Sequence, residues 1–448
     1  MKTINRHSLV INPLRSPLAI LALFLLLATA VAAQPAEEEI RANPLLSASN
    51  YVAYIDPDQP LSPAPKGYEP FYISHYGRHG SRWLTSDWQY TDVLKVLRKA
   101  DRLQKLTPLG TKLLADLEAF HRTAEQRIGD LTPLGERQHH KIGRRMTEHF
   151  PEVFRGSAQV DARSSFVVRC ILSMVAECEE LTAFNPKLSI HNDVGQCFQY
   201  YLHGYGVKND SLKALSDRAE PVKERYQQQL VHPQRLCSTL FNDADWVAAS
   251  LDAVTFMVRL FDVAANMQSH DDGLDLYPLF THDEIYAIWK WRNISHYLQY
   301  ANATLTDNKM TFTQLDLLRN IITTADTLIA KAHFNGATLR FGHEVDLLPL
   351  ACILGLGNCD TVVDDLDRLD QVWANYRIFP MAGNVQLVFF RPTEKSLKKN
   401  PNQPILVKAL LNEREIALPV APYQYPYCRW DDLRAYYIEK YNLCLPRK

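Results

Sequence analysis

A histidine flanked by two arginines is the group in this chain best suited to chemistry. Arg78-His79-Gly80-Ser81-Arg82 directly follows residues 71–74, an apolar segment typical of a buried strand. Each guanidinium can donate paired hydrogen bonds to phosphoryl oxygens, and the two charges disfavour protonation of the imidazole, so that a nitrogen lone pair can attack phosphorus. The pattern predicts a phosphate site with a histidine nucleophile, although so short a motif also fits a solvent-exposed turn.

Two further segments also lie where a predicted strand ends and a helix begins. Residues 163–169 would add Arg169 and helix N-terminal amides to the donors around an anion. Gly342-His343-Glu344 follows the strand-like residues 337–341. A histidine there can bind a phosphoryl group, and a neighbouring carboxylic acid can protonate a departing alkoxide, which is too basic to leave unassisted. Each segment alone is a weak signal, and the three together indicate phosphate ester chemistry.

Together these segments resemble the histidine acid phosphatases, and within them the multiple inositol polyphosphate phosphatases, whose substrates include phytate. The resemblance extends over most of the chain after residue 33. It is carried by residues 78–82, 131–138 with 142–143, the pair Arg163 and Arg169, 342–350 and 380–391.

The resemblance implies a role for six residues. His79 would be the nucleophile that becomes phosphorylated, and Glu344 would be the proton donor. No metal ion and no cofactor is expected, because arginines would neutralise the phosphate charge. The residues expected to bind the phosphoryl group are Arg78, Arg82, Arg169 and His343.

The expected proton donor is where this chain departs from the family. Members usually have His-Asp at this position, and the inositol polyphosphate branch has His-Ala-Glu, whereas this chain has His343-Glu344-Val345-Asp346. Glu344 stands in the place of the aspartate with one extra methylene. Asp346 is the alternative donor if the loop has a different shape.

The elements that must position these residues predict a mixed α/β fold. Residues 34–206 and 333–448 contain the strand patterns and form the expected core, a mixed β-sheet flanked by helices. Residues 207–332 contain only helical patterns and form the expected inserted all-helical cap. Thr107 and Thr132, both in the sequence Leu-Thr-Pro-Leu-Gly, predict helix N-caps followed by proline. Residues 34–70, acidic and rich in proline, predict an irregular surface lead-in.

Residues 1–33 predict export by a secretory signal peptide. Lys2, Arg6 and Arg15 precede an apolar run from Leu18 to Ala33 that ends in small residues. An uncleaved anchor is the alternative, but the run is shorter than the roughly 20 residues of a spanning helix, so no stable membrane insertion is expected after cleavage. The periplasm or the medium is the expected location. Because an exported chain favours disulfides, these are expected among Cys170, Cys178, Cys197, Cys237, Cys352, Cys359, Cys428 and Cys444.

The net charge of the chain indicates which class of partner it binds. Without residues 1–33, 46 Lys and Arg stand against 50 Asp and Glu, a formal charge of −4, whereas a nucleic-acid binder is usually basic. The expected partner is a small phosphate ester, an inositol polyphosphate, and the expected activity is its hydrolysis through a phosphohistidine. The alternatives are a broad-specificity acid or sugar-phosphate phosphatase of the same fold and an inactive relative that binds phosphate ligands.

Overall fold

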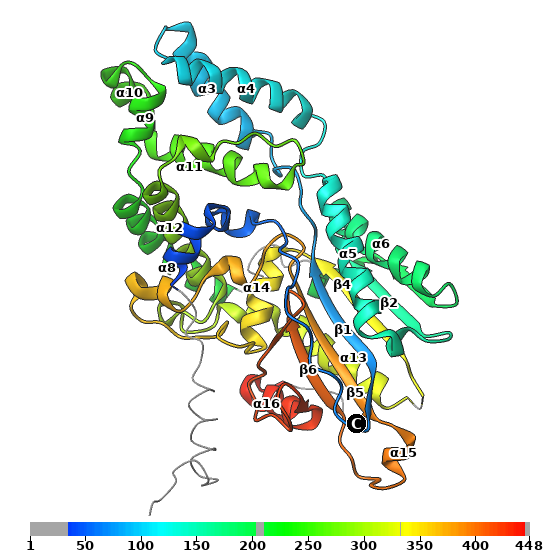
Figure 1. Ribbon diagram of the computed structural model, residues 1–448. Helices are drawn as coiled ribbons and strands as arrows, with labels where there is room; N and C mark the ends of the chain where they lie inside the picture. The colour runs from blue at the N-terminus through cyan, green and yellow to red at the C-terminus, as the bar shows by residue number, and fades with distance from the viewer. Residues whose placement is uncertain (1–34, 203–209, 332, 444–448) are drawn as a thin grey trace, which may run out of the picture.

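A mixed sheet forms the centre of the computed structural model, which describes residues 35–202, 210–331 and 333–443 (Figure 1). Along the sheet the strand order is β3-β2-β4-β1-β5-β6-β7, and β8 pairs with β6. The first four strands run parallel to one another, and β5 to β8 pair in antiparallel fashion. The strands are β1 (Tyr68–Arg78), β2 (Gln159–Ser164), β3 (Ser189–Asp193), β4 (Gly336–Gly342), β5 (Asn384–Pro392), β6 (Leu406–Leu411), β7 (Arg414–Ile416) and β8 (Cys428–Arg429). The predicted α/β class is confirmed.

Helices cover both faces of this sheet. Buried side chains of α5 and α6 pack against one face, and those of α13, α14 and α16 pack against the other. The helices are α2 (Ala36–Ala42), α3 (Trp88–Arg102), α4 (Pro108–Ala124), α5 (Pro133–His149), α6 (Val168–Phe184), α7 (Gln199–Leu202), α8 (Asp210–Leu230), α9 (Gln234–Leu240), α10 (Ala244–Ser250), α11 (Ala253–Asn266), α12 (His282–Tyr300), α13 (Leu315–Ile329), α14 (Glu344–Ile353), α15 (Glu394–Leu397) and α16 (Trp430–Tyr441).

The described part of the expected cap, residues 210–331, contains no strand. Its helices α9, α11 and α12 share one apolar cluster with α3 and α4, which lie on the other side of the expected boundary (Figure 1). The boundaries expected at 206/207 and 332/333 fall in or beside residues 203–209 and 332, which lie outside the described residues. The division into core and cap therefore stays a prediction.

The two Leu-Thr-Pro-Leu-Gly sequences begin helices α4 and α5 as predicted. The hydroxyl groups of Thr107 and Thr132 accept hydrogen bonds from the backbone N–H of Gly110 and Gly135, each at 3.1 Å. In each case a proline occupies the first turn, where its missing N–H costs no hydrogen bond.

The lead-in is not an irregular surface segment throughout, and this expectation is wrong for residues 36–51. They form α2 and a 3₁₀ helix, η2 (Pro44–Tyr51), in which Ile40, Ala48 and Tyr51 are buried in the same cluster as α11. The physical reason is that these apolar side chains lie on one side of two short helices, a spacing that the prolines further along obscure. Residues 36–51 of the lead-in therefore contribute to the buried core.

The cysteines differ from the expectation as well. Cys170, Cys178, Cys197, Cys237, Cys352, Cys359 and Cys428 are free thiols in the structure, so the predicted disulfides are wrong for pairings among these seven. Cys352, Cys359 and Cys428 share one apolar cluster, and Cys170 and Cys178 share another, yet none of these thiols is bonded to a second one. Cys444 and the expected signal peptide lie outside the described residues. Among residues 35–202, 210–331 and 333–443, no helix is both long and apolar enough to cross a membrane.

Candidate active site

Three of the predicted segments meet where parallel strands end. In the sheet, Arg78 at the end of β1 pairs with Gly342 at the end of β4, and β2 ends beside β4. Since the carboxyl ends of parallel strands lie at one edge, His79, His343 and the first turn of α6 with Arg169 are brought together. The sheet therefore assembles the predicted site from segments that are far apart in the sequence.

The loop after β1 is held by contacts from helices on one side. The N–H of Gly80 donates to the hydroxyl of Ser173 at 3.1 Å, and the N–H of Ser81 donates to the side chain of Gln138 at 2.9 Å. The Ser81 carbonyl accepts from the N–H of Thr132 at 2.9 Å. A Cβ on Gly80 would lie 2.4 Å from the carbonyl oxygen of Gly135, so only glycine allows this approach. The nucleophile loop thus has one defined backbone path.

His79 is fully buried and is fixed in one tautomer. Its Nδ1 lies 2.9 Å from the carbonyl oxygen of Gly80. Because a carbonyl oxygen only accepts, Nδ1 must donate, and Nε2 keeps its lone pair. Burial, together with the positive charges of Arg169 and Arg78, holds the pKa of His79 well below its usual value. These are the properties of an imidazole nucleophile.

The arginines form a positive cluster around this histidine. Arg78 is fully buried, and one of its nitrogens donates to the carbonyls of Asn50 at 2.7 Å and Phe379 at 2.8 Å. Burial lowers its pKa to about 10, opposed by the charge of Glu344 and assisted by Arg82 and Arg169. Its remaining guanidinium nitrogen, Nη2, has no hydrogen-bond partner among the described residues. This arrangement attracts an anion.

Arg82 and Arg169 complete the cluster from two other directions. Arg82 is buried, and its guanidinium lies 5.4 Å from the centre of the Tyr51 ring, which belongs to the lead-in. Arg169 is half-buried and donates to the carbonyl of Gly129 at 3.4 Å. Arg163, in contrast, is engaged by ion pairs with Asp161 and Asp193 at 2.7 and 3.2 Å. It belongs to the β2–β3 edge.

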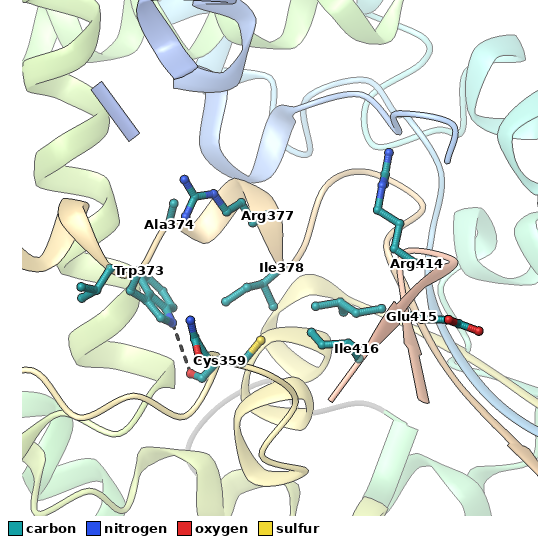
Figure 2. A pocket seen from close by; sticks show the side chains of 11 residues that line it. Cys359, Trp373, Ala374, Arg377, Ile378, Arg414, Glu415 and Ile416 are labelled. Atoms are coloured by element: carbon teal, nitrogen blue, oxygen red, sulfur yellow. Dashed lines mark hydrogen bonds between the residues drawn. The ribbon is translucent and has the colours of Figure 1, made fainter. Parts of the chain in front are cut away.

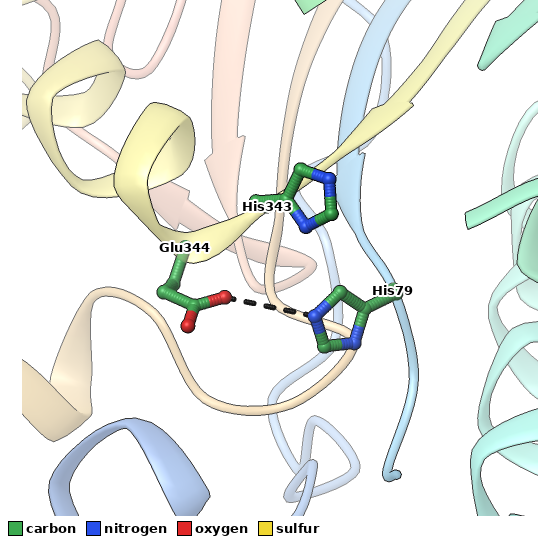
Figure 3. A group of neighbouring side chains, drawn as sticks. All are labelled: His79, His343 and Glu344. Carbon is green, nitrogen blue, oxygen red and sulfur yellow. Dashed lines mark ion pairs between the residues drawn. The ribbon is translucent and has the colours of Figure 1, made fainter. Parts of the chain in front are cut away.

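Glu344 faces the nucleophile from the start of α14 (Figure 3). Its Oε2 lies 3.2 Å from Nε of Arg78 and 3.6 Å from Nε2 of His79. Although burial raises the pKa of Glu344, the charges of Arg78 and Arg82 outweigh this and hold it well below its usual value. The amide of Asn50 also approaches Oε1 at 3.5 Å. In the free protein Glu344 is therefore ionised.

His343 and Asp346 lie on either side of this carboxylate in the sequence and have different surroundings. The ring of His343 is buried beside that of His79, with centroids 5.6 Å apart, and its Nε2 lies 3.2 Å from the hydroxyl of Ser165. Asp346 is fully buried and accepts from the side chain of Gln314 at 3.2 Å. It also interacts with Tyr76. Oε2 of Glu344, in turn, lies 3.6 Å from Nε2 of His79.

A metal ion is another ligand that this geometry allows. His79, His343 and Glu344 offer ligand atoms that all lie within 4.8 Å of one another. The electric field around them, however, is set by Arg78, Arg82 and Arg169, which all act on this group of side chains. Three guanidinium charges repel a cation and attract an anion, so the site suits phosphate.

A separate apolar pocket of about 260 Å³ lies beside the β6–β7 hairpin (Figure 2). Its charged rim residues are engaged elsewhere, since Arg377 pairs with Glu39 at 2.9 Å and Arg414 lies 3.8 Å from Asp58. Burial raises the pKa of the Cys359 thiol in its wall to about 12, which leaves it unreactive. The pocket offers no group suited to catalysis.

Comparisons with known proteins agree with the architecture. No family model matches the chain, and no curated protein matches it. Among solved structures, a multiple inositol polyphosphate phosphatase from Bifidobacterium longum in complex with phosphate matches with a TM-score of 0.67 and 17% identity, over 88% of this chain and 98% of that chain. The phytase from D. castellii matches with a TM-score of 0.62 and 14% identity, over 92% and 89%. The apo phytase of Hafnia alvei matches with a TM-score of 0.52 and 13% identity, over 84% and 98%.

The chain has the histidine acid phosphatase fold. The resemblance inferred from residues 78–82 and 342–350 is thereby confirmed at the level of fold. Within this phosphatase fold, the structure brings together all six residues singled out from the sequence.

Sequence patterns missed several residues of the site. Asn50 reaches both Arg78 and Glu344, Ser165 contacts His343, and Ser173 holds the nucleophile loop. No local sequence pattern marks Asn50, because its contacts form only where the chain folds back against the end of β1. The serines stand on either side of Arg169 in an otherwise apolar segment, which was a usable signal.

Proposed function

We propose that this protein is a phosphomonoesterase that hydrolyses inositol polyphosphates such as phytate, through a phosphohistidine on His79 and with Glu344 as proton donor. The observation that carries the proposal is the buried, unprotonated Nε2 of His79 amid three arginines and beside a carboxylate. A nucleophile, charge stabilisation and an acid are the three requirements for cleaving a phosphate ester.

In the first half-reaction, Nε2 of His79 forms a bond to phosphorus as the ester oxygen leaves and takes a proton from Glu344. Arg78, Arg82, Arg169 and His343 stabilise the charge on the other phosphoryl oxygens. In the second half-reaction, a water molecule attacks phosphorus, the nitrogen–phosphorus bond breaks, and Glu344 takes the water proton. The side chains return to their starting states, and no cofactor takes part in either step.

Substrate binding prepares Glu344 for its role as an acid. The phosphoryl group must enter the space in front of Nε2, where the carboxylate now lies at 3.6 Å. Its negative charge also offsets the field of Arg78, which keeps the free carboxyl group ionised. Both changes raise the pKa of Glu344, so proton uptake by Glu344 accompanies ester binding.

A polyanionic substrate is supported by the surroundings of the site. Lys223 of α8 and Arg292 of α12 act on His296, which also interacts with Glu344 and Arg78. Cationic side chains therefore extend from His79 toward these helices, and each is paired with a carboxylate, Lys223 with Glu220 at 2.8 Å and Arg292 with Asp262 at 2.7 Å. A structure of the Bifidobacterium longum enzyme is a complex with inositol hexasulfate, a polyanionic inositol ester.

The test is phosphate release by the purified protein from phytate, glucose-1-phosphate and p-nitrophenyl phosphate. The proposal expects the highest kcat/KM for phytate. Similar values for all three would instead identify a broad-specificity phosphatase. A protein that binds phosphate and releases none from any ester would be an inactive relative, contrary to the proposal.

We also propose that the protein is exported, on the basis of the basic and apolar pattern of residues 1–33. N-terminal sequencing after expression in a secretion-competent host should find a start between Val31 and Gln34. An intact Met1 on protein retained in the cytosol would contradict export.

A further inference from the structure

His296 and Tyr300 lie one turn apart on α12, and neither has a role in the reaction proposed above. Because they are four residues apart, both side chains lie on the same face of the helix, and their ring centroids are 6.2 Å apart. Both side chains are partly exposed. The helix packs against η2 and against α14, the helix that begins at Glu344 (Figure 1). α12 is therefore a near neighbour of the proposed proton donor.

Direct contacts connect His296 to the residues that hold Arg78. Its ring meets that of Phe379 at a centroid distance of 5.2 Å and nearly at a right angle. The carbonyl of Phe379 accepts a hydrogen bond from Arg78 at 2.8 Å. Nδ1 of His296 lies 2.9 Å from the amide nitrogen of Asn375, and the same nitrogen lies 3.2 Å from Oγ of Ser49 in η2. His296 is thereby anchored to Phe379 and to η2, whose carbonyl groups both bind Arg78.

The contacts of Asn375 fix the tautomer of His296. Nε1 of Trp289 can only donate, and it lies 3.1 Å from the side-chain oxygen of Asn375. The amide nitrogen of Asn375 therefore faces His296 and donates to Nδ1. Since Nδ1 must keep its lone pair, the hydrogen of the neutral ring is on Nε2. Burial and the positive charge of Arg292 lower the pKa of His296 to about 3, so the ring is neutral above that pH.

Neither of the two donors on this face is used by another described residue. Nε2 of His296 and the hydroxyl of Tyr300 have no hydrogen-bond partner within residues 35–202, 210–331 and 333–443, and both atoms are accessible to solvent. Burial and the charges of Glu344 and Asp346 raise the pKa of Tyr300, so its hydroxyl keeps its hydrogen. The face therefore presents two neutral donors that a ligand can reach.

These donors lie on the side of the site where the leaving alcohol must be. In the proposed reaction Glu344 faces the leaving oxygen, because it gives that oxygen a proton. η2 connects Glu344 to this face of α12, since Asn50 approaches Glu344 at 3.5 Å and Asn375 links the residue before Asn50 to His296. His296 and Tyr300 also interact electrostatically with Glu344. The acceptor that fits is therefore a group carried by the leaving alcohol, rather than the phosphoryl group bound by the arginines.

We propose that His296 and Tyr300 bind the leaving alcohol by donating hydrogen bonds to a second phosphate group beside the scissile ester, and that they determine a preference for polyphosphorylated alcohols. Phosphate oxygens suit this role, because hydrogen bonds to an anionic acceptor are stronger than those to a neutral one. An ester without a second anionic group leaves both donors without an acceptor. This role in specificity rests on the proposed function, whereas binding of a polyanion by the two donors can be measured without turnover.

The test measures the affinity of the purified protein for inositol hexasulfate and for inorganic phosphate by calorimetry. His296→Leu and Tyr300→Phe each remove one donor, and each should weaken binding of inositol hexasulfate about tenfold or more, because a hydrogen bond to a charged group is lost. Inorganic phosphate has no second group to bind, so its affinity should fall by less than about threefold. His296→Gln, whose amide can donate near the position of Nε2, should bind both ligands within about threefold of wild type.

Turnover allows the same comparison with substrates. In His296→Leu and Tyr300→Phe, kcat/KM should fall about tenfold or more for phytate and less than about threefold for p-nitrophenyl phosphate. His282→Leu is the control, because His282 begins α12, about 20 Å along the helix from His296. This variant should follow wild type with every ligand and substrate.

The proposal is wrong if either His296→Leu or Tyr300→Phe binds inositol hexasulfate as tightly as wild type, or if either variant weakens both ligands equally. Tyr300→Phe removes only one oxygen atom, so it provides the test even if His296→Leu does not fold. A wild type that does not bind inositol hexasulfate would overturn the role of the two donors. A wild type that binds it but releases no phosphate from any ester would overturn only the proposed hydrolysis.

Discussion

Nε of Arg78 lies 3.2 Å from Oε2 of Glu344, and this ion pair joins a proposed phosphate-binding residue to the proposed proton donor. The pair keeps Glu344 ionised in the free protein, which is the state that cannot donate a proton. The same pair is sensitive to a bound phosphate, since the new anion competes for Arg78. The proposed acid catalysis by Glu344 would therefore be coupled to occupancy of the site.

The basicity of the leaving group distinguishes Glu344, the proposed proton donor, from Asp346. An inositol alkoxide needs a proton in the transition state far more than p-nitrophenolate does. Glu344→Gln should lower kcat/KM for phytate by about 10²–10⁴-fold and lower it much less for p-nitrophenyl phosphate. Asp346→Asn is the matched control and should show no such selectivity. A selective loss in Asp346→Asn alone would move the donor assignment to Asp346.

The ion pair also predicts how stability depends on pH. Because Arg78 lowers the pKa of Glu344, the carboxylate stabilises the fold above its unfolded pKa of about 4.5, and this contribution is lost as the pH falls through the lower folded value. The melting temperature of Glu344→Gln should fall below that of wild type at neutral pH, and the difference should shrink in acid. Added phosphate should stabilise the variant more than wild type. A difference independent of pH would contradict the ionised pair.

Removal of the nucleophile should separate binding from turnover. His79→Ala should reduce kcat for phytate by at least about 10³-fold, because no other group replaces the attacking nitrogen. Phosphate affinity, measured by calorimetry, should change by less than about tenfold, since the arginines remain. Acid-quenched wild type should contain acid-labile phosphate that the variant lacks. His121→Ala, which removes a histidine of α4 paired with Asp87, is the control and should stay active.

The repeated helix start provides a matched test of loop placement. A Cβ on Gly135 would lie 2.2 Å from the carbonyl oxygen of Ser81, and a Cβ on Gly110 would lie 2.3 Å from that of Leu240. Gly135→Ala and Gly110→Ala should each destabilise the protein by about 1–3 kcal/mol, because both overfill a backbone contact. Only Gly135→Ala displaces the nucleophile loop, and it should lower kcat/KM by about 10²-fold in folded protein. Equal activities of the two variants would show that the loop tolerates the shift.

The sequence by itself determined the local elements and the residue types that stand at the strand ends. Strand-like runs at 71–74 and 337–341 identified β1 and β4, a predicted strand end before residues 163–169 identified β2, and Thr-Pro pairs marked the starts of α4 and α5. His79 and Glu344 were identified because a strand end followed by a distinctive motif is a local signal. Such signals can be recognised in the sequence alone, because hydrogen bonding and side-chain alternation within an element involve residues close in the chain.

Only the tertiary structure decided which residues surround these motifs. Asn50 and Glu344 are 294 residues apart, and no local pattern relates them. His139 and Glu177 meet at 2.7 Å because Gly143 permits two helices to pack closely. The tertiary structure likewise leaves as free thiols seven cysteines that composition suggested would pair. Burial and long-range contact set protonation and pairing, because the cost of desolvating a group depends on everything that encloses it.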